Sequence, residues 1–86
     1  MNANAVLRDF LNKEPFRPIR VELVNDEVIR IPHPDFASVP PSSTDRYSPF
    51  FVIYDDKGNP RHVNPMLVSS IGQDFGDPSR KSGRRR

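Results

Sequence analysis

The 86-residue sequence contains no cysteine, only four glycines, and no apolar run close to the roughly 20 residues of a membrane-spanning helix. Without cysteine, neither a disulfide nor a thiolate zinc site is available to stabilise the fold. A chain of this length buries only about 60% of the surface that it exposes when unfolded. We therefore expect one small domain with a modest hydrophobic core.

The N-terminal segment also lacks the signature of a secretory signal peptide, which is a basic head followed by an apolar core. Residues 1–9 contain no such head before an apolar run, and they include Asp9. Together with the absence of cysteine and of a membrane-spanning run, this pattern predicts a cytoplasmic protein that does not bind membranes.

A strong charge of one sign is missing from most of the chain, although the whole sequence carries a net charge of +2. Residues 1–72 hold eight basic and nine acidic side chains, whereas residues 73–86 hold five basic and two acidic ones. Because apolar content also falls sharply after Gly72, we expect a single domain over 1–72 and a disordered basic tail over 73–86. The tail residues that could contact nucleic-acid phosphates without sequence preference are Arg80, Lys81, Arg84, Arg85 and Arg86.

What the sequence does contain is a hairpin pattern between Pro15 and Phe36. Apolar residues alternate with charged ones over Ile19–Leu23, which is the period of a strand with one buried face. β-branched residues dominate Val28–Ile31, which suits the partner strand. The prolines that follow end this second strand, because proline cannot donate to a ladder. We expect the two segments to pair antiparallel.

The register of this hairpin depends on the length of its loop. A two-residue loop would divide the large apolar side chains between the two faces of the hairpin. A three-residue loop over 25–27 would place Leu23 opposite Ile29 and collect those side chains on one face. We expect this second register, which also sets Glu22 opposite Arg30 as an exposed cross-strand pair.

Two motifs of this segment carry a resemblance to a known family. Pro15–Arg20 reads PFRPIR, and after the two strands His33–Phe36 reads HPDF. The chain resembles a family of short uncharacterised bacterial proteins that carry a PFRPFRI…DG…V.HPDF pattern, with the match extending over Leu7–Ile71. Asn25–Asp26 stands where the family pattern has Asp-Gly. The resemblance implies a common fold and supplies no function.

An amphipathic helix is predicted upstream of the hairpin. Apolar residues recur at helical spacing from Ala3 to Leu11, so they form one stripe that has to dock on the rest of the fold. Asn2 or Asn4 could cap the start of this helix. The first proline of the chain disfavours helix at the residue before it, so we expect the helix to end near Lys13.

Further short strands are predicted downstream. Residues 37–49 form a polar loop rich in proline and serine, which is longer than usual connections. The strand at Phe50–Asp55 is apolar on both faces, so it should either be central or have one face covered by the helix. After a turn at 55–60, Arg61–Asn64 should be its hairpin partner, and Met66–Ile71 should be the last strand, with a possible helical turn at its start.

The order of these elements predicts the fold class. A helix followed by about five short strands bent by prolines indicates a mainly β fold with an N-terminal α-helix, built as a small Sm-like or SH3-like half-open barrel. An antiparallel sheet with one covering helix is the alternative. Open sheet edges in either architecture could support self-association.

Motifs for catalysis or metal binding are scarce. A site of two histidines and a carboxylate would need His33 and His62 to converge with an acid, and their spacing resembles no ligand motif. The acidic turn at Asp55–Asn59 is too short for a calcium loop and lacks the closing glutamate. No serine lies in an elbow motif, and no glycine-rich phosphate loop is present. We therefore expect no metal, no cofactor and no enzymatic activity.

A binding function is the leading hypothesis. The corner at His33 and Asp35 is expected to be stabilised by the Asp35 carboxylate, which should accept hydrogen bonds from backbone amides. The candidate binding residues are His33, Asp35, Arg46 and Tyr47, which lie in this corner and in the 37–49 loop. We expect a non-enzymatic binding or adaptor module with an unidentified protein partner. The alternative is an Sm-like RNA-binding protein assisted by the basic tail.

Overall fold

The computed structural model of the chain describes residues 2–47 and 49–75. The predicted tail residues 76–86 lie outside the described residues. The elements of the described part follow one another as α1 (Ala3–Leu11), β1 (Ile19–Leu23), β2 (Val28–Ile31), the 3-10 helix η1 (Pro34–Phe36), β3 (Ala37–Ser38), the 3-10 helix η2 (Ser42–Tyr47), β4 (Phe51–Tyr54), β5 (Pro60–Val63), the 3-10 helix η3 (Pro65–Leu67) and β6 (Val68–Gln73).

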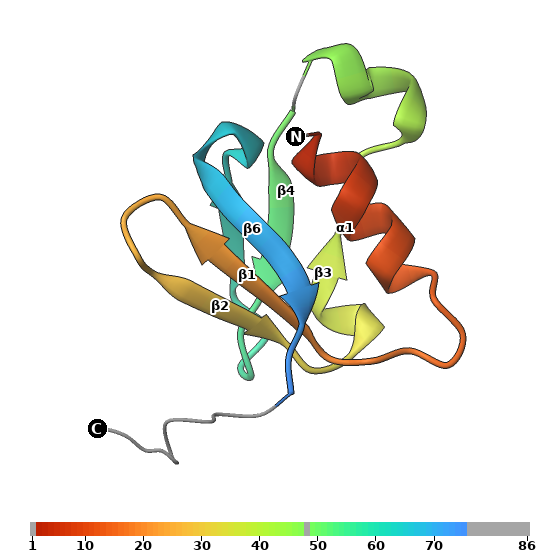
Figure 1. The fold of residues 1–86 in the computed structure, drawn as a ribbon, viewed down its shortest axis with the longest axis vertical. Helices are drawn as coiled ribbons and strands as arrows, with labels where there is room; N and C mark the ends of the chain where they lie inside the picture. The colour runs from red at the N-terminus through yellow and green to blue at the C-terminus, as the bar shows by residue number, and fades with distance from the viewer. Residues whose placement is uncertain (1, 48, 76–86) are drawn as a thin grey trace.

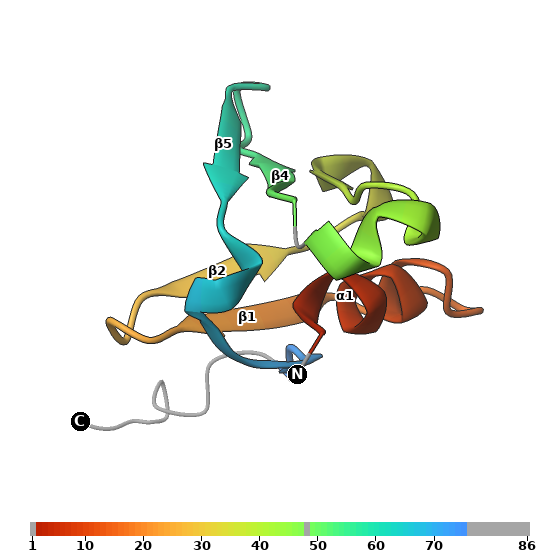
Figure 2. The ribbon, with the colours of Figure 1, turned by 90° about the horizontal axis from the view of Figure 1, so that it is seen from above.

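The strands of the described residues form two antiparallel sheets of three strands each (Figure 1). The first, sheet A, has the order β2-β1-β6, and the second, sheet B, has the order β3-β4-β5. Viewed from above, the β4–β5 hairpin stands away from sheet A on the side of β2 (Figure 2). The prediction of a mainly β fold with an N-terminal helix is confirmed, and two sheets with a shared core are compatible with a half-open barrel.

The helix α1 forms as its sequence predicts. The Asn2 side chain accepts a hydrogen bond from the Ala5 N–H at 3.1 Å and so caps the first turn. Leu7 lies on the apolar stripe and is fully buried. Asn4, in the first turn of α1, is also buried, and its Nδ2 donates to the Pro49 carbonyl at 2.9 Å. The helix is therefore fixed both by its apolar stripe and by a polar contact to the segment before β4.

The core lies between the two sheets and the helix. Phe51 and Ile53 point inward from β4, which is the central strand of sheet B as predicted. The residues of β1 alternate between buried and half-buried positions, which confirms the period-two pattern of that strand. The fully or nearly buried apolar residues are Ala3, Leu7, Ile19, Val21, Leu23, Ile31, Phe51, Ile53, Val63 and Val68.

The strands β1 and β2 pair antiparallel, but the predicted register is wrong by two residues. Ile29 lies opposite Val21 rather than opposite Leu23. A shift of two residues keeps every side chain on its own face, so the inward-facing residues of the hairpin still face inward. The expected pairing of Glu22 with Arg30 is also wrong, because Arg30 lies opposite another arginine.

The difference in register arises in the loop of the hairpin. The loop has three residues as predicted, but it spans 24–26 and is closed by a hydrogen bond from the Leu23 N–H to the Glu27 carbonyl at 2.9 Å. Its last residue, Asp26, has a φ of 70°. Aspartate enters this left-handed region more readily than glutamate, whereas the predicted loop would have placed Glu27 there.

The segment after β2 is more regular than the sequence indicated. The predicted polar loop over 37–49 contains strand β3 and the 3-10 helix η2. The Arg8 side chain of α1 donates to the Pro40 carbonyl at 2.7 Å, which ties this segment to the helix. At the other end of the chain, β6 continues through Gln73, and Asp74 forms an ion pair with Arg30 at 3.2 Å.

Phe51→Ala should lower the free energy of unfolding by about 3–5 kcal/mol, because it empties a fully buried aromatic site. Urea unfolding measures this loss. Phe50→Ala is the matched control, since the neighbouring ring is 52% exposed and its removal should cost far less. Equal losses of unfolding free energy for the two variants would contradict the assignment of Phe51 to the face of β4 that packs in the core.

Candidate functional site

The predicted binding residues of the proline corner lie on η1. His33 precedes η1, and its Nδ1 accepts a hydrogen bond from the Asp35 N–H at 3.2 Å. The expectation that the Asp35 carboxylate accepts hydrogen bonds from backbone amides is not met in the described residues, since the His33 imidazole is the acceptor at this corner and the Asp35 side chain is 86% exposed. The His33 ring also lies 6.5 Å from the Phe16 ring and 6.4 Å from the Phe36 ring. These contacts give His33 a structural role in the corner.

The other two predicted residues lie on η2 and contact each other. Both are exposed, the Arg46 Nη2 lies 3.1 Å from the Tyr47 hydroxyl, and the guanidinium lies 5.1 Å from the centre of the tyrosine ring. In Figure 1, η2 lies at the top of the molecule, whereas η1 lies well below it beside β3. The four predicted residues therefore form two separate surface features rather than one site.

The part of the chain that the structure describes contains neither a metal-binding cluster nor a membrane-spanning helix. No group of three histidine, aspartate or glutamate side chains there is arranged to hold a metal ion. None of the helices within those residues has the length and apolar character needed to cross a membrane.

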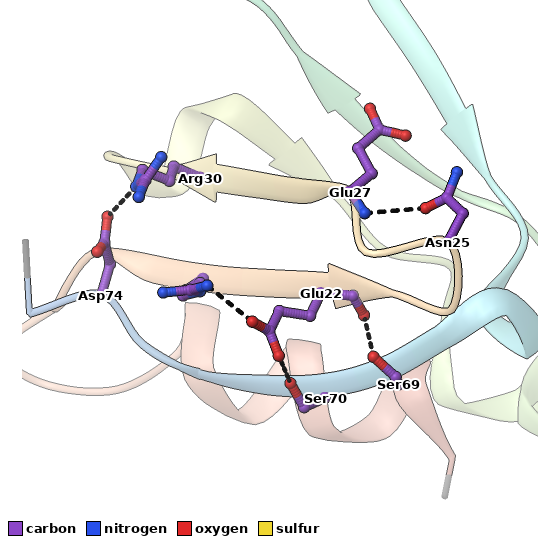
Figure 3. Close-up of polar contacts among 8 residues, drawn as sticks. Glu22, Asn25, Glu27, Arg30, Ser69, Ser70 and Asp74 are labelled. Carbon is purple, nitrogen blue, oxygen red and sulfur yellow. Dashed lines mark hydrogen bonds and ion pairs between the residues drawn. The ribbon is translucent and has the colours of Figure 1, made fainter. Parts of the chain in front are cut away.

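The outer face of sheet A carries a network of paired charges (Figure 3). Arg20 lies opposite Arg30 on neighbouring strands, an arrangement that is unfavourable unless each charge has a partner. The Arg20 guanidinium forms an ion pair with Glu22 at 2.7 Å, and the Arg30 guanidinium pairs with Asp74 at 3.2 Å. Ser70 donates a further hydrogen bond to the Glu22 carboxylate at 2.9 Å. The two arginines are thus neutralised within the sheet.

A cleft of about 370 Å³ lies between β2 and the β4–β5 hairpin. Its lining residues come from β2 and from the β4–β5 hairpin, which diverge in Figure 2. Its volume falls near the lower end of the usual range for ligand pockets. The apolar residues among those that line it are Val28, Ile29, Ile53, Tyr54 and Pro60.

One wall of the cleft is a free strand edge. Bonded and non-bonded residue pairs alternate along an antiparallel ladder. Because Glu27 accepts a hydrogen bond from Leu23, the next bonded position on β2 is Ile29. The backbone N–H and C=O groups of Val28 and Arg30 therefore point away from β1. Within residues 2–47 and 49–75, no strand pairs with β2 on that side.

An ion pair closes one end of the cleft. The Arg61 guanidinium binds both carboxylate oxygens of Glu27, with Nη2 donating to Oε1 at 2.8 Å and Nη1 donating to Oε2. This contact joins the first residue before β2 to strand β5, and Figure 3 shows the Glu27 carboxylate pointing away from β1. The hydrogen bond from Arg61 lowers the pKa of Glu27, and the same bond raises the pKa of Arg61.

The remaining acid of the cleft is also engaged. Asp55 Oδ1 accepts hydrogen bonds from the Asn59 N–H at 2.8 Å and from the Lys57 N–H at 2.9 Å. The backbone bond from Asn59 is the main reason that the pKa of Asp55 is lowered. Asp55 therefore holds the β4–β5 turn, in which Gly58 adopts a φ of 84°. The cleft presents paired charges and apolar side chains, which suits binding better than acid–base chemistry.

The sequence predicted open sheet edges that could support self-association, but it did not indicate which edge is open. The cleft residues Val28, Tyr54 and Arg61 were not singled out, because each looks like an ordinary strand residue in the sequence. The pairing of Glu27 with Arg61 spans 34 positions and has no local signal. The signal that could have indicated the edge is the proline corner, because it ends β2 at Ile31.

Comparison of the chain with protein-family models, with curated proteins and with solved structures finds no match. The resemblance to the bacterial family with the PFRPFRI and HPDF motifs therefore stays a prediction. The site has to be interpreted from its own geometry.

Glu27→Gln should make folding stability less sensitive to acid. The lowered pKa of Glu27 means that its ion pair stabilises the fold above the ordinary value of 4.5 and that this stabilisation is lost as the pH falls through the lowered value. Urea unfolding at neutral pH and at about pH 3 measures the change. Glu14→Gln, at an exposed position outside the cleft, is the control. An unchanged pH dependence in Glu27→Gln would show that the ion pair does not form in solution.

Proposed function

We propose that this chain is a non-enzymatic binding module whose binding surface is the cleft between β2 and the β4–β5 hairpin, and that its partner is another protein. The observation that carries the proposal is the coincidence of an apolar cleft with an unpaired strand edge. Exposed strand edges are ready templates for pairing with another chain, and folds usually cover or blunt them. Here the edge stays open beside apolar side chains.

The walls of the cleft are held in place by the core, which favours a preformed site. Ile53 lies in the cleft and is also part of the buried core, and Ile29 packs against that core. A pocket that is rigid before binding loses less conformational entropy when the partner arrives. Binding at this position therefore needs no rearrangement of the two sheets.

The paired charges of the described residues favour a protein partner over a nucleic acid. Phosphate binding depends on basic side chains that are available to release counterions. The arginines near the cleft, Arg30 and Arg61, are each bound to a carboxylate. The alternative function, RNA binding by an Sm-like barrel, is supported by the helix-first order of elements and by the basic composition of the C-terminal segment.

A library of random twelve-residue peptides displayed on phage tests the proposed surface. We expect peptides selected on the wild-type protein to bind Val28→Lys at least about tenfold more weakly, because the new charge stands at a residue that lines the cleft and belongs to its free strand edge. His62→Lys is the matched control, since it adds the same charge at an exposed position of β5 outside the cleft lining. Isothermal calorimetry measures both affinities. Failure to select any peptide, or equal binding by the two variants, would contradict the proposal.

A truncation to residues 1–75 tests the alternative. This variant keeps eight basic and ten acidic residues and loses five of the thirteen basic side chains of the chain. We expect no binding of a fluorescent single-stranded RNA in low salt, because the remaining arginines near the cleft are paired. RNA binding retained by residues 1–75 would favour the Sm-like RNA-binding function instead.

A further inference from the structure

We infer that the partner enters the cleft as a single extended polypeptide segment and adds to sheet A as a fourth strand beside β2, through the backbone groups of Val28 and Arg30. This inference rests on the proposed function, because it specifies how the partner of the same cleft is bound. It adds the shape of the partner and its mode of binding, because a cleft alone could hold a ligand of another shape.

The hydrogen-bonding groups of the edge support strand addition. Val28 and Arg30 each direct one N–H donor and one C=O acceptor away from β1. Within the described residues, the backbone hydrogen bonds of loops and turns include none to these four groups. A strand placed about 4.8 Å from β2 would satisfy all four, two as donors and two as acceptors. Main-chain pairing of this kind is a common mode of peptide recognition.

The other edges of the two sheets are less suited to pairing with a partner strand. On β5, the residues that direct backbone groups away from β4 are Pro60 and His62, and proline has no N–H to donate. On sheet A, the edge opposite β2 is β6, and α1 packs against that strand. The remaining edge, β3, has only two residues. Within residues 2–47 and 49–75, the edge of β2 is therefore the one with two complete donor and acceptor pairs beside a cleft.

The shape of the cleft restricts the occupant to one strand. Strand β2 has four residues, so its edge is about 13 Å long and accommodates a segment of about four residues. The ion pair between Arg61 and Glu27 holds β5 close to one end of that edge. A folded domain that presented the edge of its own sheet would clash with the β4–β5 hairpin, whereas a single extended segment would fit beside this hairpin. We therefore favour a flexible segment of another protein over a second copy of this chain.

The charges of the cleft indicate the side chains of that segment. The lining carboxylates and guanidinium groups are already paired with each other, with Asp74 or with backbone amides. A charged side chain on the partner would therefore lose hydration without gaining a free counter-charge. Side chains on an added strand alternate between the two faces of the sheet. The segment should thus be uncharged over about four residues, with apolar side chains at alternate positions that contact Ile29 and Ile53.

A pair of substitutions at one position separates the backbone role of the edge from its side-chain role. Arg30→Pro removes an N–H that points away from β1, so the β1–β2 ladder stays complete. Arg30→Ala removes the guanidinium but keeps the N–H. For the tightest peptide from the phage selection, we expect Arg30→Pro to weaken binding about tenfold and Arg30→Ala to change it less than threefold. Thermal unfolding checks that both variants are folded.

Backbone-methylated peptides test the same claim without altering the protein. Methylation at alternate amides should abolish binding when the methyl groups lie on the edge that faces β2, and should be tolerated when they lie on the opposite edge. Tolerance of both patterns would overturn strand addition while leaving cleft binding, and so the proposed function, intact. Peptides that bind Val28→Lys as tightly as the wild-type protein would overturn both strand addition and the proposed cleft binding. Sedimentation of the free protein should show a monomer, and a dimer that dissociates in Arg30→Pro would identify a second copy as the occupant instead.

Discussion

The break in the chain at Pro32 and Pro34 is the constraint on which the rest of this structure depends. Neither proline can donate to a strand ladder, so β2 ends at Ile31 and the chain turns through η1 before it continues as β3 in the other sheet. The interruption separates β2, which pairs with β1, from β3, which pairs with β4. The consequence is two small sheets in place of one, a diverging gap between them, and a strand edge that faces this gap.

Specific side chains stabilise the turn of the chain after β2. His33 caps η1 through its imidazole nitrogen, and its ring lies between the rings of Phe16 and Phe36, both of which pack on the core. At the far end of the cleft, the bidentate contact of Arg61 with Glu27 fixes the distance between the two sheets. Specific contacts therefore hold both the corner after β2 and the Glu27 end of the cleft.

Local patterns in the sequence were enough to predict the elements and most of their faces. The stripe of α1, the alternation of β1 and the two apolar faces of β4 each depend on neighbours within a few positions, and the structure agrees with them. The hairpin register was wrong because two registers that differ by two residues bury the same face, so hydrophobicity could not separate them. The preference of Asp26 for a positive φ was the deciding signal.

The candidate site could not be predicted in the same way, since its parts come from distant segments. The free edge of β2 follows from the absence of a neighbouring strand in the described fold, and the pairing of Glu27 with Arg61 follows from the crossing of the two sheets. The four residues chosen from the sequence were polar and lay in loops, which is a sound general rule for binding sites. In this fold, the structure points instead to apolar residues and to the main chain.

Amide hydrogen exchange of the free protein tests the central claim most directly, because it reports on each backbone N–H of β2 separately. If β2 is an open edge, the N–H groups of Val28 and Arg30 should exchange rapidly while that of Ile29, which is bonded to β1, exchanges slowly. Equal protection of Val28, Ile29 and Arg30 would show that the edge is already covered in the free protein and would contradict the account.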